Sequence, residues 1–244
     1  MKFFFQKIVL LSLGLSFLSC ENDMVTEIVQ STSINKIMPL GASRVEGNHP
    51  EHHSFRYEIW KMLLENFWVF DFIGTQSDLS LYPEINNISF DFDHEGRGGW
   101  TSGQILQQLE VGILETGVPD IVLFSSPGGN DALENLSYEE TTKNIYAIIE
   151  LLQSLNPNIT ILLEQMAPAH SNIMDEDLSN YLSDLHEDMF WAANEYSSYS
   201  SQVIVVDMYT GFLDSMLADD VHYSPSGAYF VAERYYQVLE TVLQ

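Results

Sequence analysis

Short apolar runs alternate with longer amphipathic segments along the chain from residue 34 onward. Apolar runs of strand length lie at residues 34–40, 68–73, 120–125, 159–163 and 203–206. Apolar side chains recur at helical spacing in residues 56–66, 101–115, 138–155, 174–196 and 225–243. Strands that alternate with helices pair in parallel through right-handed crossovers. The pattern therefore predicts an α/β fold: a three-layer α/β/α sandwich around a five-stranded parallel sheet.

The first 19 residues have the pattern of a signal peptide. Lys2 and Lys7 open the chain, and the apolar run at residues 8–18 is too short to span a bilayer. The only cysteine, Cys20, comes directly afterwards. This placement resembles the lipobox of bacterial lipoproteins, with Phe17 where leucine is more usual. The resemblance implies that Cys20 is lipidated and becomes the mature N-terminus.

This organisation predicts a location as well as boundaries. We expect a signal peptide over residues 1–19, a lipidated polar tether over residues 20–33 and a single folded domain over residues 34–244. The protein would be secreted across the inner membrane and lipid-anchored in the bacterial cell envelope, at the outer membrane or the cell surface. Each buried methylene contributes about 0.8 kcal/mol, so several acyl chains anchor a domain stably.

The composition excludes several classes of protein and partner. The chain has 35 acidic and 9 basic residues and a formal net charge of −26, so it repels nucleic acids and anionic lipid headgroups. Hydrophobic residues make up 45% of the chain, which is enough for a packed core and excludes disorder. With Cys20 lipidated, no thiol is left for a disulfide. We expect no nucleic-acid partner, and membrane contact through the lipid anchor only.

Polar residues with catalytic chemistry follow the predicted strands, where the active sites of parallel sheets lie. Gly41-Ala42-Ser43 follows the first strand, Gly128-Gly129-Asn130-Asp131 follows the third, and Asp219-Asp220-Val221-His222 precedes the last helix. In this order and spacing the residues resemble SGNH (GDSL-type) hydrolases, over residues 37–236. The segments IMPLGAS, DFDHEGRGGWTSGQI and PDIVLFSSPGGND are most similar to carbohydrate esterase family 3, whose members remove acetyl groups from xylan. The resemblance implies a flavodoxin-like SGNH hydrolase domain.

The resemblance assigns three residues to a catalytic triad. Ser43 is the nucleophile, and His222 is the base that takes its proton. Asp219 orients the imidazole and stabilises its cation. By sequence alone Asp220 is an alternative orienting residue; the family pattern, Asp-x-x-His, favours Asp219.

An oxyanion hole is implied in the same way. It consists of the backbone N–H groups of Ser43 and Gly99 and the side chain of Asn130. Gly98 is an alternative to Gly99, which is preferred because Gly-Trp-Thr leads into a helix, as the corresponding block of the family does. Asp131 is expected to cap a turn or a helix. The resemblance implies neither a metal nor another cofactor.

The implied activity is that of a serine esterase acting on an acylated small molecule or polysaccharide. It would hydrolyse short acyl esters, with acetyl preferred, on carbohydrate through an acyl-serine intermediate. One alternative is a broad carboxylesterase or lipase without sugar preference. Another is a catalytically silent lipoprotein that binds glycans.

The second alternative rests on a departure from the family motif. Ala42 stands where the motif has an aspartate, whose expected role is to hydrogen-bond the turn that presents the serine. All reacting groups remain, so we expect an active enzyme with a lower rate. Tyr223 also replaces the proline that often follows the histidine, a change that we expect to be tolerated.

Two further clusters of polar residues have open assignments. His49, His52 and His53 lie with Glu51 shortly after the nucleophile. We expect a solvated loop there, with a metal site as the alternative. Residues 91–95 contain Asp91, Asp93, His94 and Glu95. We expect a structural hydrogen-bonding role there, with a cation site such as calcium as the alternative.

Overall fold

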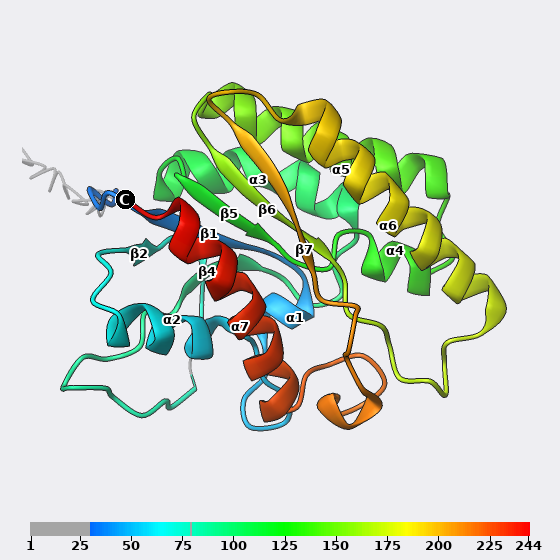
Figure 1. Ribbon diagram of the computed structural model, residues 1–244, viewed down its shortest axis with the longest axis horizontal. Helices are drawn as coiled ribbons and strands as arrows, with labels where there is room; N and C mark the ends of the chain where they lie inside the picture. Colours follow the sequence, from blue (N-terminus) through cyan, green and yellow to red (C-terminus); the bar gives the residue numbers. More distant parts are fainter. Residues whose placement is uncertain (1–29, 79) are drawn as a thin grey trace, which may run out of the picture.

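The computed structural model describes residues 30–78 and 80–244 (Figure 1). The predicted signal peptide, the predicted lipidation site Cys20 and most of the predicted tether lie outside these residues, so they stay predictions. Among the described residues, no helix combines the length and the apolar character needed to cross a membrane.

A mostly parallel sheet forms the centre of the fold. In the described residues it has seven strands, in the order β3-β4-β1-β5-β6-β7 with β2 beside β1. All strand pairs are parallel except β3 with β4, which is antiparallel. The bounds are β1 Lys36–Gly41, β2 Asp71–Phe72, β3 Gln76–Ser77, β4 Asp93–Gly96, β5 Ile121–Phe124, β6 Thr160–Gln165 and β7 Gln202–Asp207.

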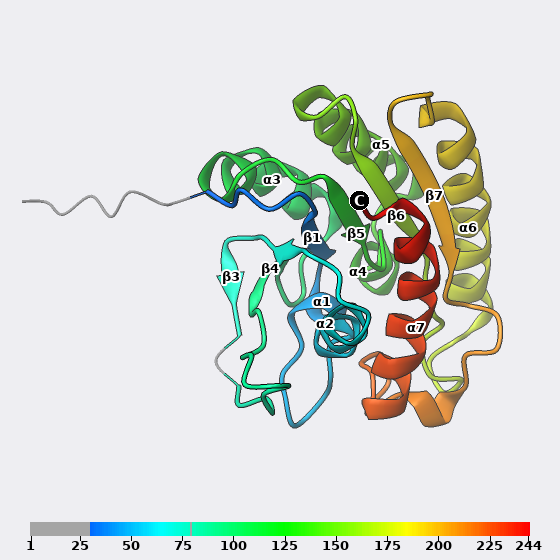
Figure 2. The same ribbon diagram turned by 60° about the vertical axis from the view of Figure 1, so that its left-hand side comes forward.

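Helices cover both faces of this sheet. α3, α5 and α6 pack on one face, and α2 and α7 pack on the other (Figure 2). In β5, Val122 and Phe124 belong to the first core, whereas Ile121 and Leu123 belong to the second. Strands buried on both faces are apolar throughout, which is why the hydrophobic pattern locates them. The predicted α/β/α sandwich is confirmed.

The helix bounds are α1 Ser43–Glu46, α2 Arg56–Glu65, α3 Ser102–Thr116, α4 Gly129–Leu133, α5 Tyr138–Leu155, α6 Glu176–Tyr196 and α7 Pro225–Val242, with a short 3-10 helix, η1, at Asp214–Met216.

The sheet differs from the predicted five-stranded parallel sheet at one edge. The strand predicted over residues 68–73 is reduced to β2, and the unpredicted strands β3 and β4 add an antiparallel pair. β4 is polar, so the hydrophobic pattern does not reveal it. Its buried side chains have hydrogen-bond partners instead: His94 Nδ1 accepts from the Gly96 N–H at 3.0 Å, and Glu95 accepts from the Thr75 N–H at 2.8 Å.

The predicted site residues follow the carboxyl ends of neighbouring strands. Ser43 opens α1 directly after β1, and Gly99 follows β4. Asn130 lies in α4, soon after β5, and His222 lies in the loop between η1 and α7. The sheet order β4-β1-β5 therefore places the first three of these segments side by side.

Candidate active site

Ser43 is presented by a tight turn between β1 and α1. Gly41 is required there, because a Cβ at this position would lie 2.7 Å from the carbonyl oxygen of Ser125. The turn is closed by backbone groups: the N–H groups of Val45 and Glu46 both donate to the carbonyl of Ala42 at 3.0 Å. These bonds hold the turn without an aspartate side chain at position 42.

Asp219 and His222 form a close pair in the loop before α7. Asp219 Oδ2 lies 2.7 Å from His222 Nδ1, and Asp219 Oδ1 accepts the backbone N–H groups of Val221 at 2.9 Å and His222 at 2.7 Å. Burial opposes ionisation of Asp219, but the hydrogen bonds from Val221 and His222 lower its pKa to about 2. An ionised carboxylate only accepts, so Nδ1 must donate and Nε2 is left free to accept a proton. Asp219, not Asp220, is therefore the aspartate that contacts the ring.

Ser43 and His222 line the same pocket, together with Gly99 and Asn130. In the described residues no hydrogen bond joins the Ser43 hydroxyl to His222. In free enzymes this contact is often long and tightens when substrate binds. The arrangement brings together the nucleophile, base and oxyanion donors that the sequence predicts.

The two glycines proposed for the oxyanion hole differ in their hydrogen bonds. The N–H of Gly98 already donates to Glu46 Oε2 at 2.6 Å, whereas the N–H of Gly99 has no hydrogen-bond partner in the described residues. Gly99 has a φ of 76°, which side-chain-bearing residues rarely adopt. Asn130 Nδ2 donates to the Trp100 carbonyl at 2.8 Å, which leaves one of its two N–H bonds for a ligand. This geometry favours Gly99 over Gly98.

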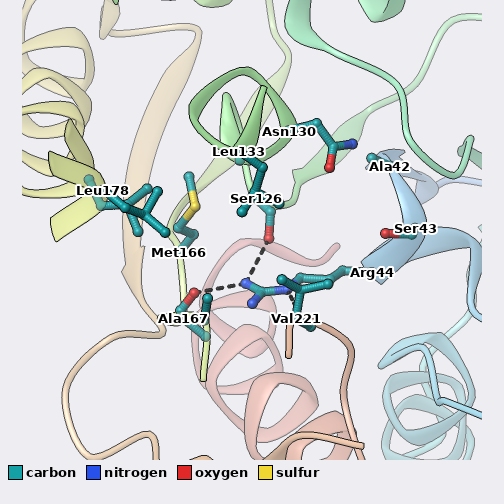
Figure 3. Close-up of a pocket in the computed structure, with 13 residues that line it drawn as sticks. Ala42, Ser43, Arg44, Ser126, Asn130, Leu133, Met166, Ala167, Leu178 and Val221 are labelled. Carbon is teal, nitrogen blue, oxygen red and sulfur yellow. Dashed lines mark hydrogen bonds between the residues drawn. The ribbon is translucent and has the colours of Figure 1, made fainter. Parts of the chain in front are cut away.

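Two pockets meet at Ser43, and the second has the more polar lining. The first, called the apolar pocket, has a volume of about 50 Å³ and contains the side chains of Ala42, Leu133, Met166, Leu178 and Leu182. In Figure 3, Leu133, Met166 and Leu178 lie across this pocket from Ala42 and Ser43. The second, called the polar pocket, has a volume of about 470 Å³ and is lined by His222, His52, Asn48, Glu46, Gly98 and Gly99. Ser43, Asn130 and Val221 border both pockets.

Comparison with protein families decides the class of enzyme. The GDSL-like Lipase/Acylhydrolase family matches residues 76–229. The chain belongs to this family. The matched range contains Gly99, Asn130, Asp219 and His222, whereas Ser43 precedes it. No curated protein sequence matches the chain significantly.

Solved structures of esterases share the fold of this acylhydrolase. An acetyl esterase variant with an acetate ion has a TM-score of 0.72 at 22% identity, over 86% of this chain and 98% of that chain. A carbohydrate esterase family 3 protein from Talaromyces cellulolyticus gives 0.71 at 23% identity, over 86% and 98%. A family 3 carbohydrate esterase from Clostridium thermocellum gives 0.68 at 26% identity, over 86% and 99%. The acylhydrolase therefore has the SGNH hydrolase fold, and its family identifies it as a hydrolase.

Arg44, which sequence reasoning missed, ties the nucleophile segment to two other loops of the acylhydrolase. The side chain is buried, and its guanidinium donates to the carbonyls of Val221 and Ala167 at 2.8 Å and of Pro168 at 3.1 Å. Val221 precedes His222 in the chain, so Arg44 links the turn that carries Ser43 to the loop that carries His222. In the sequence, only the position of Arg44 directly after Ser43 could have pointed to this role.

The replacement of proline by Tyr223 belongs to the same network. The Arg44 guanidinium lies 4.9 Å from the centre of the buried Tyr223 ring, which is within the range of a cation–π contact. The Tyr223 hydroxyl lies 3.4 Å from Glu164 Oε1, and Ser126 Oγ donates to the same oxygen at 3.2 Å. Ser126 also accepts from Arg44 at 3.3 Å. The tyrosine thus supplies a buried hydroxyl that a proline would lack.

The loop that carries the histidine cluster is exposed at Asn48, Pro50 and Glu51, as expected of a solvated loop, but its histidines are not exposed. His52 and His53 are half-buried, and the ring of His52 stacks on the ring of His222 with their centres 4.0 Å apart. Nδ1 of His49 and Nδ1 of His52 are buried without hydrogen-bond partners in the described residues. Stacking across a loop leaves no trace in residue spacing, so the sequence could not reveal this contact.

The remaining sequence-predicted polar residues have structural contacts. Asp131 accepts from the N–H of Ser102 at 2.8 Å and from its hydroxyl at 2.6 Å, so it caps α3 as expected. Asp91 accepts from the N–H of Phe72 at 2.7 Å. Burial, followed by the charges of two arginines, lowers the pKa of His94 to about 2. Within residues 30–78 and 80–244, no group of three or more metal-ligating side chains is gathered at one place.

Proposed function

We propose that this acylhydrolase is a serine esterase that removes short acyl groups, with acetyl preferred, from a carbohydrate. The observation that carries the proposal is the position of Ser43 between a small apolar pocket and a large polar pocket, with the Asp219–His222 pair on the polar side. The acetyl esterase and the carbohydrate esterases among the solved structures support the acyl group and the substrate class.

The proposed reaction proceeds in two balanced steps. His222 Nε2 takes the proton of the Ser43 hydroxyl while Oγ attacks the ester carbonyl carbon. The carbonyl oxygen becomes an oxyanion, which accepts hydrogen bonds from the N–H groups of Ser43 and Gly99 and from the side chain of Asn130. The carbon–oxygen bond to the alcohol then breaks, and His222 returns its proton to the leaving oxygen. Water releases the acid from the acyl-serine by the same route.

Proton transfer assigns each pocket to one half of the substrate. The leaving oxygen must meet His222, so the alcohol lies in the polar pocket, whose volume of about 470 Å³ is in the usual range for small-molecule sites. The acyl chain then lies in the apolar pocket. A water-sized group needs about 10–15 Å³, so the apolar pocket of about 50 Å³ holds only a few carbon atoms. The two volumes support a short acyl group on a large polar alcohol.

A broad carboxylesterase without sugar preference is the second candidate. It is favoured by the leucine-rich wall of the apolar pocket, which accepts any short aliphatic chain. Equal specificity constants for nitrophenyl esters and for acetylated oligosaccharides would support this candidate.

The test is acetate release from acetylated xylan and from 4-nitrophenyl acetate, by wild type and by Ser43→Ala. We expect Ser43-dependent release from both substrates. Release from the nitrophenyl ester alone would keep the esterase and contradict the carbohydrate substrate. If neither substrate reacts, a silent glycan-binding protein becomes the better account, and binding to polysaccharide that is unchanged in Ser43→Ala would establish it.

A further inference from the structure

The ring of His52 lies flat against the ring of His222. Their centres are 4.0 Å apart and their planes differ by 14°. His52 also lines the polar pocket with Ser43. Neither the triad nor the oxyanion hole requires this second imidazole, so the contact has no role in the reaction as described above.

Backbone pairing fixes the stack. The N–H of His52 donates to the carbonyl of Asn48, and the N–H of Asn48 donates to the carbonyl of His52, both at 3.1 Å. The next residue, His53, donates its N–H to the carbonyl of Tyr223 at 2.9 Å. Side chains on segments paired in this way are held in contact across the pair. His222 is thus held at its edge by Asp219 and covered on one face by His52.

The surroundings of His52 favour its neutral form. Its Nδ1 is buried without a hydrogen-bond partner in the described residues, so a proton on that atom would be a buried and unpaired donor. Burial, followed by the positive charge that His222 can carry, lowers the pKa of His52. The carboxylates of Asp219 and Glu51 oppose this lowering but do not reverse it. The titratable groups around the ring are His222 and Asp219 from the loop before α7, Glu51 and His53 beside it in the chain, and Glu46 across the polar pocket.

We propose that His52 is a positioning residue for His222, and this inference rests on the triad of the proposed function. Its neutral ring restricts the imidazole to the orientation set by Asp219, and its face stabilises the imidazolium that forms when His222 takes the proton of Ser43. A cation over an aromatic face within about 6 Å is attracted by the negative charge density of that face. A second cation at the same place would oppose the reaction, which is why the neutral form matters.

Two substitutions separate the aromatic face from simple packing. His52→Phe keeps a flat aromatic ring without a titrating nitrogen, and His52→Leu fills the space without an aromatic face. His53→Leu is the matched control, since His53 contacts Tyr223 through its backbone and does not line either pocket. The assay is the steady-state hydrolysis of 4-nitrophenyl acetate across the neutral pH range, with thermal unfolding to show that each variant is folded.

We expect His52→Phe to keep the wild-type kcat within about twofold, with an unchanged acid limb of the pH profile. We expect the kcat of His52→Leu to lie about two- to fivefold below that of His52→Phe, the size of an exposed cation–π contact. His53→Leu should match wild type in both constants.

Three results would overturn the proposal. Equal kcat values for the Leu and Phe variants would mean that only packing matters. An acid limb that moves by about one pH unit in His52→Phe would mean that His52 is charged in the working range. A decrease in kcat of more than about tenfold in His52→Phe would mean that a ring nitrogen of His52, not the face of its ring, supports the reaction. If His52→Leu does not fold, the pH profile of His52→Phe still tests whether His52 is neutral in the working range.

A wild-type enzyme that shows no Ser43-dependent hydrolysis would instead refute the proposed function, so failure of this inference and failure of the proposed function are distinguishable.

Discussion

The apolar pocket and the polar pocket meet at Ser43, yet different parts of the chain build them. Regular elements supply the apolar walls: Leu133 comes from α4, and Leu178 and Leu182 come from α6. The polar pocket is built mostly by loops, through Asn48, His52 and the glycines before α3. Side chains on packed helices have little freedom, whereas loops vary readily. In the proposed reaction, helices therefore set the acyl specificity, and loops set the alcohol specificity.

The largest expected effect removes the group that both pockets share. Ser43→Ala should lower kcat/KM on the order of 10⁴-fold or more for every ester, because Ser43 carries the only hydroxyl among the described residues that line both pockets. Steady-state kinetics on 4-nitrophenyl acetate measures this loss, with circular dichroism to show an intact fold. Comparable activity in wild type and variant would place the nucleophile elsewhere.

The next largest effect concerns the residue that orients the base on the polar side. Asp219→Asn should lower kcat about 10²–10⁴-fold, because the two backbone N–H groups keep the amide oxygen, and the amide NH2 group then faces Nδ1 of His222 and favours the wrong tautomer. The pKa of Asp219 is about 2, so its carboxylate is ionised throughout the range in which the enzyme is assayed, and protonation of Asp219 itself adds no pH dependence there. Asp220→Asn is the matched control and should stay within about twofold of wild type. A larger loss in the control than in Asp219→Asn would reverse the assignment.

A third effect concerns the oxyanion donor that borders both pockets. Asn130→Ala should lower kcat about 10²–10³-fold with a smaller change in KM, since its free N–H acts on charge that develops in the transition state. The measurement is a comparison of kcat and KM on acetyl and butyryl nitrophenyl esters. Equal losses for both chain lengths are expected. A loss confined to the longer chain would show that Asn130 only shapes the apolar pocket.

Filling the apolar pocket should change the preference between acyl chain lengths more than the rate of acetate release. Leu178→Trp places a larger side chain in a small pocket, so the ratio of butyrate to acetate hydrolysis should fall about tenfold. Leu114→Trp is the matched control, because Leu114 is exposed on α3 and lines neither pocket. An unchanged ratio in Leu178→Trp would mean that the acyl chain lies elsewhere.

The smallest effect is expected at the departure from the family motif. Ala42→Asp should preserve kcat or raise it by no more than about threefold, because backbone bonds already close the turn that presents Ser43. Parallel kinetics of the two proteins on 4-nitrophenyl acetate measures it. A large loss would show that this turn is built around alanine and cannot accept the carboxylate.

The sequence predicts those features that depend on hydrophobic pattern or on the spacing of neighbouring residues. The apolar strands are visible because both faces are buried, and the Asp-x-x-His spacing is visible because Asp219 and His222 lie in one loop. β4 is missed because hydrogen bonds, not apolar side chains, keep its residues buried. The sequence also does not show how close His52 comes to His222.

The contacts of Arg44 are a second feature that the sequence does not reveal. Its hydrogen bond to the Val221 carbonyl joins residues 177 positions apart, and no spacing rule connects them. The sequence predicts Ser43 as the nucleophile, but the contact that links the Ser43 segment to the His222 loop depends on how the sheet brings the loops together. The assignment of the two pockets likewise required the structure.

The most direct test of the two-pocket account is a crystal structure of the enzyme inactivated by an alkylphosphonate nitrophenyl ester with a butyl chain. The account predicts phosphonylation of Ser43, with the butyl chain against Leu178 and Leu182 in the apolar pocket and the phosphonate alkoxy group facing His222. A butyl chain in the polar pocket, or covalent attachment to a residue other than Ser43, would contradict it.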